Sequence, residues 1–269
     1  ALNPEGNKTT DFVNDFGYPH LFISDSKISD GMGTSYACPM VTGCIALLLS
    51  HGDNNTKLSW RDVKELISIS CDNTIDPTSY ADIKTSVKNI WFTNGAGRKY
   101  NINYGYGLLD CKKLLDNSIN WTLLPTREYT WSSNIDIQSS GEIITSDGIY
   151  FDVEITDDIL TSSDGSLDVT KCRIENVQMI VSTSGASKIH ELDLRIKSPD
   201  CDHTVSCFNS EVISGLNSTN QLSDTPVLVE CFRGENPKGT WEIAFKDVNP
   251  NTENKITKLE LKIFGHVLP

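Results

Sequence analysis

The spacing of apolar residues changes at Leu124-Pro125, and this change limits the possible folds more than any other feature of the chain. Before it, apolar residues recur at helical intervals; after it, they alternate with mostly polar residues. Alternation is typical of strands that bury one face. The alternating runs are Ile149, Phe151, Val153 and Ile155; Leu192, Leu194 and Ile196; Trp241, Ile243 and Phe245; and Leu259, Leu261 and Ile263. Residues 125–269 are therefore predicted to form an all-β sandwich or jelly roll.

The most apolar segment of the other half begins at Ser35. It continues through Val41 to Leu49 and ends before Gly52, a residue that commonly closes helices. Pro39 is expected in the first turn, where its missing N–H costs little. A helix that is hydrophobic on nearly every side is expected to lie inside a larger domain.

Two further helices are predicted from their capping residues. Ser59 and Asp62 have the spacing of a capping pair, and Asp110 stands directly before a third helical pattern. A buried strand is expected at 20–24, and loops at 1–19 and 72–103. Residues 1–124 are therefore predicted to form an α/β domain.

Composition narrows the classes of function. The net charge of −13 argues against nucleic-acid binding and favours basic partners, although the same charge also serves solubility. The chain is 269 residues long and holds no apolar run of the length that spans a bilayer. It begins without Met or a signal peptide, so a mature portion or a fragment is expected.

Cysteines and glycosylation sequons indicate the secretory pathway. Cys38 and Cys44 are expected as core thiols, because six residues of helix separate them by about 9 Å along its axis. The remaining candidates for pairing are Cys201 with Cys207 and Cys172 with Cys231. Four sequons begin at Asn7, Asn54, Asn120 and Asn217.

Ser35 is the candidate nucleophile. It follows Gly33-Thr34 at the mouth of the apolar helix, where backbone N–H groups and the helix dipole stabilise an oxyanion. A serine at a helix start is also a common N-cap, and this alternative stays open from the residues alone. His20 is expected to be a structural residue at a strand end, and His51 to interact with the dipole at the end of the helix.

Metal binding is not predicted. The segment from Asp200 to Cys207 lacks a second pair with zinc spacing, so a disulfide loop is favoured over zinc. Asp157, Asp158 and Asp164 do not match an EF-hand.

Four colinear segments resemble a known family. The run Gly33-Thr34-Ser35-Tyr36-Ala37-Cys38-Pro39 resembles the serine motif of subtilisin-like proteases. Three more segments narrow the resemblance to kexin and furin-like proprotein convertases: Leu58 to Val63, Asn94 to Asp110, and Cys231 to Trp241, preceded by Ser198-Pro199. The chain departs from the family's pattern at Met32, before the serine motif, and at Arg233, where the family has Trp.

The resemblance implies an organisation and an activity. Residues 1–124 would be the C-terminal part of a subtilisin-like catalytic domain, and 125–269 the β jelly-roll P domain. Ser35 would be the catalytic serine, whereas the catalytic Asp and His and the oxyanion Asn would precede this chain, which alone would be inactive. The complete enzyme would be a calcium-dependent serine endopeptidase of the Golgi or later secretory pathway, membrane-bound where a C-terminal anchor follows. It would cut peptide and protein precursors after paired basic residues.

A second reading remains open. The chain could be a non-catalytic copy, truncated or degenerate, whose β domain is a stabilising or binding module. The two readings differ in whether Ser35 ever works with a histidine supplied from upstream sequence.

Overall fold

Contacts between Cα atoms divide the chain into two units. We analysed a computed structural model, which describes residues 7–10, 28–31, 34–51, 57–74, 91–126, 128–137, 141–161, 164–185, 191–208, 221–247 and 254–269. The first unit comprises Ala1–Ile75 with Tyr106–Leu123, and the second Asp76–Gly105 with Leu124–Pro269. The predicted boundary at 124/125 stays a prediction, and each unit is described by itself.

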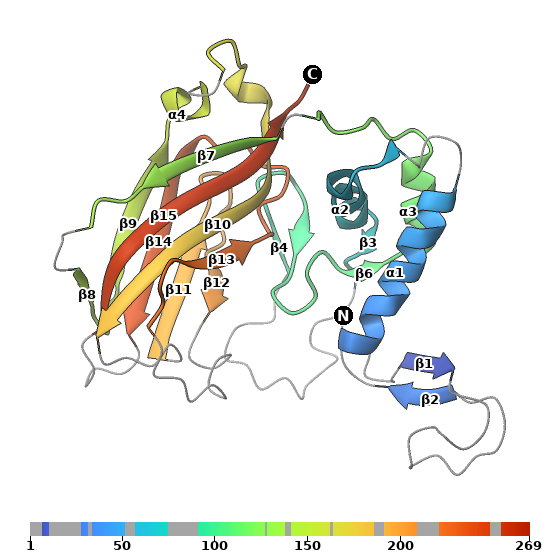
Figure 1. Cartoon of the computed structure of the whole chain (residues 1–269), viewed down its shortest axis with the longest axis horizontal. Helices are drawn as coiled ribbons and strands as arrows, with labels where there is room; N and C mark the ends of the chain where they lie inside the picture. The colour runs from blue at the N-terminus through green and yellow to red at the C-terminus, as the bar shows by residue number, and fades with distance from the viewer. Residues whose placement is uncertain are drawn as a thin grey trace. The chain divides into compact units, whose positions relative to one another are not determined.

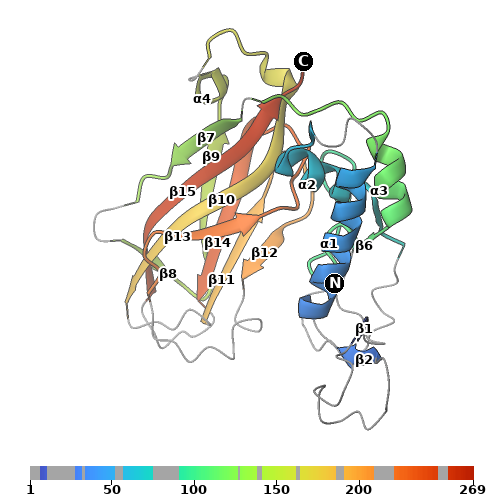
Figure 2. The same cartoon turned by 45° about the vertical axis from the view of Figure 1, so that its right-hand side comes forward.

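Three helices build the first unit (Figure 1). They are α1 (Thr34–Ser50), α2 (Trp60–Ile69) and α3 (Cys111–Ser118). Their shared core consists of Leu48, Leu66 and Leu114, one fully buried leucine from each helix. The three predicted helices are therefore confirmed, and α1 and α3 lie side by side in two views (Figures 1 and 2).

Local side-chain chemistry sets the starts of α2 and α3. The Ser59 hydroxyl accepts the Asp62 N–H at 3.2 Å, and an Asp62 carboxylate oxygen accepts the Ser59 N–H at 2.9 Å. This is the predicted capping box, and the other Asp62 oxygen accepts the indole N–H of Trp121 at 2.9 Å. Asp110 caps α3 by accepting the Lys113 N–H at 3.0 Å.

Short strands complete the first unit. Strand β1 (Asn7–Thr10) pairs with β2 (Ile28–Gly31), and β3 (Cys71–Asp72) pairs with β6 (Leu108–Leu109). The prediction of a loop throughout 1–19 is therefore wrong at β1, where backbone pairing with β2 forms a strand without any apolar alternation in the sequence. The strand predicted at 20–24 lies outside the described residues.

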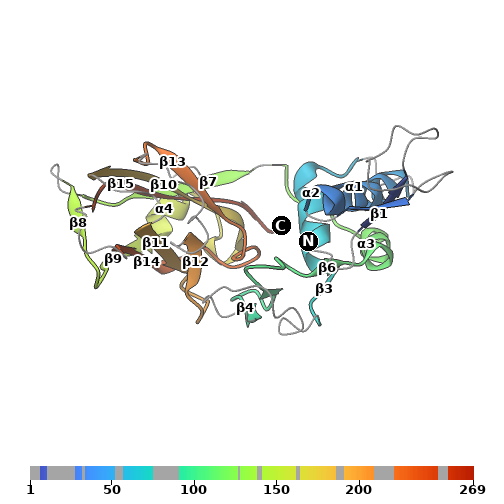
Figure 3. The ribbon, with the colours of Figure 1, turned by 90° about the horizontal axis from the view of Figure 1, so that it is seen from below.

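Two large antiparallel sheets with a shared core make up most of the described part of the second unit. The order of the first is β13-β10-β15-β7, with β8 also on β15, and that of the second is β12-β11-β14-β9. The strands of the first sheet are β7 (Tyr129–Asn134), β8 (Glu142–Ile144), β10 (Cys172–Gly185), β13 (Thr225–Val229) and β15 (Asn254–Val267). Those of the second are β9 (Ile149–Ile155), β11 (Leu192–Lys197), β12 (Val205–Phe208) and β14 (Gly239–Asp247). Figure 3 shows them as two layers.

The apolar alternation explains the core of this unit. Trp241, Ile243 and Phe245 of β14 are buried, and intervening residues such as Glu242 are exposed. The alternating runs predicted from the sequence all lie in strands, namely β9, β11, β14 and β15. Short helical turns, α4 (Asp157–Thr161) and η3 (Val169–Lys171), lie between β9 and β10.

A hairpin from the middle of the chain is attached to the β unit. It consists of β4 (Phe92–Thr93) and β5 (Lys99–Tyr100). The buried Asn94 donates through Nδ2 to the carbonyl oxygens of Cys231 at 2.8 Å and Arg233 at 3.1 Å. A surface loop was predicted across 72–103; the described part from residue 91 is instead a hairpin with long-range anchors.

Replacing Asn94 by Ala is expected to destabilise the β unit by about 2 kcal/mol. The variant leaves two carbonyl oxygens without their amide donor and removes the acceptor of the Arg98 N–H inside the turn. Urea unfolding measures the effect. Lys99→Ala, at an exposed position of the same hairpin, is the control, and equal midpoints for the two variants would contradict the anchoring role.

Candidate functional site

Ser35 is exposed and is the second residue of α1. The first N–H groups of a helix have no partner within it, so the backbone at Ser35 presents free donors in the direction of the helix dipole. The first turn of α1 contains no acidic residue that would oppose an anion there. This end of the helix therefore has backbone donors of the kind that stabilise negative charge, and the predicted role of Ser35 stays a prediction.

Pro39 is the sixth residue of α1, inside the helix, and the prediction that it lies in the first turn is wrong. A proline has no N–H to donate to the carbonyl four residues earlier, and here that carbonyl belongs to Ser35. One turn further on, the Thr42 hydroxyl donates to the Cys38 carbonyl at 3.1 Å. The early turns of α1 thus depart from regular helical hydrogen bonding at the candidate nucleophile.

Among the described residues of the first unit, no histidine lies next to Ser35. His51 follows the end of α1, about 24 Å along the axis from Ser35 at the helical rise of ~1.5 Å per residue. In the other unit, His203 stacks on Phe92 at 4.3 Å between ring centroids, and His266 bonds Glu175 at 2.8 Å. His20 lies outside the described residues.

The apolar surface of α1 is largely uncovered. Met40 is 59% exposed and Leu47 55%, although α1 is apolar almost throughout. Only the side of the helix that carries Leu48 packs against α2 and α3. A helix buried on all sides was predicted; the described residues cover one side only. An exposed apolar face of this kind marks a surface that another part of a protein covers.

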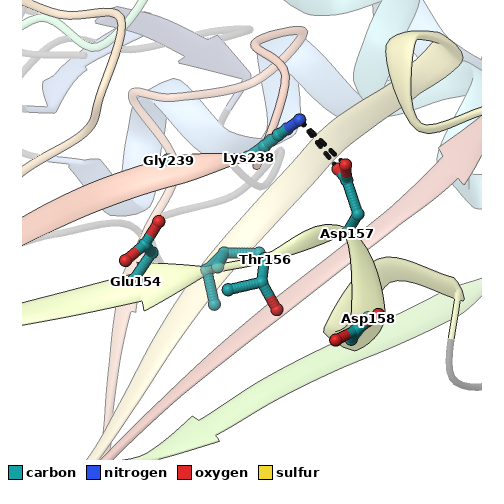
Figure 4. A pocket seen from close by; sticks show the side chains of 7 residues that line it. Glu154, Thr156, Asp157, Asp158, Lys238 and Gly239 are labelled. Carbon is teal, nitrogen blue, oxygen red and sulfur yellow. Dashed lines mark hydrogen bonds and ion pairs between the residues drawn. The ribbon is translucent and has the colours of Figure 1, made fainter.

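Figure 4 shows an acidic pocket in the β unit, at the junction of β9 and α4. It has a volume of about 300 Å³ and is lined by Glu154, Ile155, Thr156, Asp157, Asp158, Lys238 and Gly239. Lys238 forms an ion pair with Asp157 at 2.9 Å across it. Within the described part of the chain, no group of three or more His, Cys, Asp or Glu side chains is arranged to hold a metal ion.

Glu235 is a buried carboxyl group with an unusual pKa. Burial raises the pKa of Glu235 to about 7, and the nearby Asp200 carboxylate adds to the shift. The Gly95 N–H donates to Glu235 Oε1 at 2.8 Å and opposes the shift in part. This carboxyl therefore connects the hairpin to the β unit and titrates near neutral pH.

The stability of the β unit is expected to fall as pH rises from about 4.5 to about 7. Because folding raises the Glu235 pKa from its usual 4.5, the folded state holds a proton in this window that the unfolded state releases. The loss is on the order of 3 kcal/mol. Glu235→Gln should flatten this part of the pH profile in chemical unfolding, whereas Glu242→Gln, at an exposed site, should leave it unchanged. A slope that survives in Glu235→Gln would contradict the assignment.

The predicted disulfides are not formed. All eight cysteines lie in described residues, and all are free thiols. Cys201 Sγ instead accepts the His203 N–H at 3.4 Å, and Cys172 Sγ points to the Asp168 carbonyl at 3.9 Å. The pairings Cys201–Cys207 and Cys172–Cys231 are therefore wrong for this structure, in which all four residues are free thiols.

The thiols on α1 also differ from prediction. Cys38 is exposed rather than a core residue, and Cys44 is half-buried.

None of the helices among the described residues is both long and apolar enough to cross a membrane.

Comparison with known proteins gives the class first. Residues 18–107, which include Ser35, match the model of the subtilase family. The solved serine protease of Aeromonas sobria shares the fold: the TM-score is 0.67 at 24% identity, over 90% of this chain and 45% of that one. Both matches are to subtilisin-like serine proteases.

Curated relatives then give the group within the class. The chain is 26% identical over 245 residues to human proprotein convertase subtilisin/kexin type 6, covering 89% of this chain and 23% of the relative. It is 25% identical over 241 residues to kexin of Saccharomyces cerevisiae, covering 87% and 26%. The chain is similar to the kexin/furin-like proprotein convertases, as its motifs predicted. It spans about a quarter of the length of these two relatives.

Proposed function

We propose that this chain is the C-terminal portion of a kexin/furin-like serine endopeptidase, with Ser35 as its catalytic nucleophile. Residues 1–124 would complete a catalytic domain begun by upstream sequence, and 125–269 would be its jelly-roll P domain. The observation that carries the proposal is α1, which places an exposed Ser35 at its N-terminus and leaves much of its apolar surface uncovered. An upstream part of the domain would cover that surface.

The chemistry of the proposed site follows from the position of Ser35. Its hydroxyl oxygen would attack a peptide carbonyl carbon while a histidine from the upstream part takes the hydroxyl proton. The Ser35 backbone N–H and an upstream Asn would stabilise the oxyanion of the tetrahedral intermediate. The histidine would then protonate the leaving amine, and water would release the acyl group from the serine oxygen. In this proposal the chain alone has no peptidase activity.

Substrate and compartment are part of the same proposal. Cleavage after paired basic residues suits the net charge of −13, which attracts basic peptides. The four sequons suit residence in the secretory pathway. Calcium dependence is general among subtilisin-like convertases, but the described residues offer no calcium site, so no step is assigned to the ion.

A second candidate is a stable module without catalysis. The β unit encloses a core of its own, with Trp131, Trp241 and Phe245 fully buried. A truncated or degenerate copy could use this unit for binding or to stabilise a partner. The uncovered surface of α1 favours the protease over this alternative, because an apolar helix face that nothing covers would promote aggregation in water.

Peptide cleavage tests the proposal. The chain, co-expressed with an upstream segment carrying Asp, His and Asn in that order, is expected to hydrolyse a fluorogenic peptide ending in Lys-Arg. A matched Ala-Ala peptide should react at least about 100-fold more slowly, since a binding pocket that pairs charges discriminates strongly. Equal rates would contradict the specificity, and no hydrolysis of either peptide by the folded complex would favour the non-catalytic module.

A further inference from the structure

Two thiols lie close together where α1 packs on α3. Cys44 lies in the third turn of α1, and Cys111 is the first residue of α3. Cys111 is near enough to Cys44 to raise its pKa, and both are half-buried free thiols. No motif in the sequence connects these two positions, which are separated by α2 and the hairpin.

Buried leucines hold the two cysteines in place. Leu48 follows Cys44 by four residues, and Leu114 follows Cys111 by three, so each leucine lies on the same helix face as its cysteine. Both leucines are fully buried in the same cluster, and Cys44 packs against that cluster. The proximity of the thiols therefore follows from the packing of α1 against α3. These two helices lie side by side in Figures 1 and 2.

The environment favours a disulfide over a pair of thiolates. Burial raises the pKa of Cys44 to about 11, and the neighbouring Cys111 adds to the shift. Disulfides that are easily reduced have the opposite character: one of their cysteines has a lowered pKa, and its stabilised thiolate favours the reduced form. Oxidation at this seam would replace two half-buried S–H groups by one uncharged bond, without burying a charge.

We propose that Cys44 and Cys111 form a disulfide that joins α1 covalently to α3. A thiolate of one cysteine attacks an external disulfide such as oxidised glutathione, which releases one thiol and leaves a mixed disulfide. The second cysteine then displaces the other glutathione. The protein loses two electrons and two protons, and the external disulfide becomes two thiols. The bond would fix α1, which carries Ser35 near its N-terminus, to the rest of its unit, and it does not depend on Ser35 being catalytic.

Peptide mapping of the full chain tests the crosslink. The reduced chain is incubated with a glutathione redox buffer, its free thiols are alkylated, and the digest is analysed by mass spectrometry. We expect a linked peptide pair containing Cys44 and Cys111, with a mass about 2 Da below the sum of the two reduced peptides. The oxidised chain should melt about 5–10 °C higher than the reduced chain, because the bond closes a long loop.

Cysteine variants sharpen the test. Cys38→Ser, at an exposed site of the same helix, should keep the linked peptides, whereas Cys44→Ser should lose them and leave Cys111 open to alkylation. Two results on the unmodified chain would overturn the proposal without any variant. One is alkylation of Cys44 and Cys111 to the same extent as Cys38 after oxidation; the other is a crosslink from either residue to a different cysteine.

Discussion

Ser35→Ala is expected to lower kcat of the completed enzyme by a factor of about 10⁴–10⁶. In the proposed mechanism, the variant removes the hydroxyl oxygen that would form the acyl-enzyme, while the backbone N–H that would stabilise the oxyanion remains. Because Ser35 is exposed, replacing it should cost little folding stability. Rates on a peptide ending in Lys-Arg, measured with and without the substitution in the same co-expressed complex, give the result.

The control for this experiment is the serine at the opposite end of α1. Ser50 is exposed and donates its hydroxyl to the Leu47 carbonyl at 3.0 Å. Ser50→Ala should keep kcat within a factor of about 3, as expected for an exposed substitution with a small stability effect. If Ser35→Ala kept the same activity as Ser50→Ala, another nucleophile would be responsible.

Trp241→Ala is expected to destabilise the β unit by about 3–5 kcal/mol. The indole is fully buried on β14, its N–H donates to the Pro237 carbonyl at 3.0 Å, and its ring meets Phe232 edge-on at 5.2 Å between centroids. The substitution therefore leaves a large cavity, breaks an aromatic contact and orphans a carbonyl. Denaturant unfolding of the full chain measures the loss.

Tyr150→Ala on the neighbouring strand β9 is the matched control. Tyr150 is 74% exposed, so truncation of its ring should change the unfolding free energy by less than about 0.5 kcal/mol. A similar midpoint for the Trp241 and Tyr150 variants would mean that the sandwich core does not depend on Trp241 as the burial predicts.

Local signals made much of the fold predictable. The Ser59–Asp62 capping box and the Asp110 cap fix helix starts within a few residues of sequence, and both are confirmed. The alternation after Leu124 follows from one buried face per strand, which also needs no knowledge of partners. Such features are readable because their cause lies within one turn or one strand.

Long-range contacts were not predictable in the same way. Asn94 bonds residues more than 130 positions away, and Cys44 lies near Cys111 although α2 and four short strands separate them in the sequence. Glu235 stood in a recognised motif, yet its raised pKa arises from burial against a hairpin that the sequence indicated only as a loop. The spacing of cysteines likewise suggested pairs that are not bonded in the folded chain.

The sequence was sufficient to predict the position of the candidate nucleophile at the start of a helix. Gly33-Thr34-Ser35 before an apolar helix predicted a serine at a helix N-terminus, and the structure places it there. The catalytic role of Ser35 remains the proposal, because no described residue of its unit provides a base beside it. The uncovered face of α1 was not expected from the helix pattern, which predicted burial on all sides.

Labelling with a fluorophosphonate tests the central claim most directly. The probe reacts with a serine only where a base activates it, so the isolated chain should stay unlabelled. With the upstream segment that carries the Asp, His and Asn, Ser35 should be labelled, and Ser35→Ala should abolish the label. Labelling of Ser35 in the isolated chain would contradict the proposal that its catalytic partners come from upstream sequence. A folded complex without label at Ser35 would contradict its role as nucleophile.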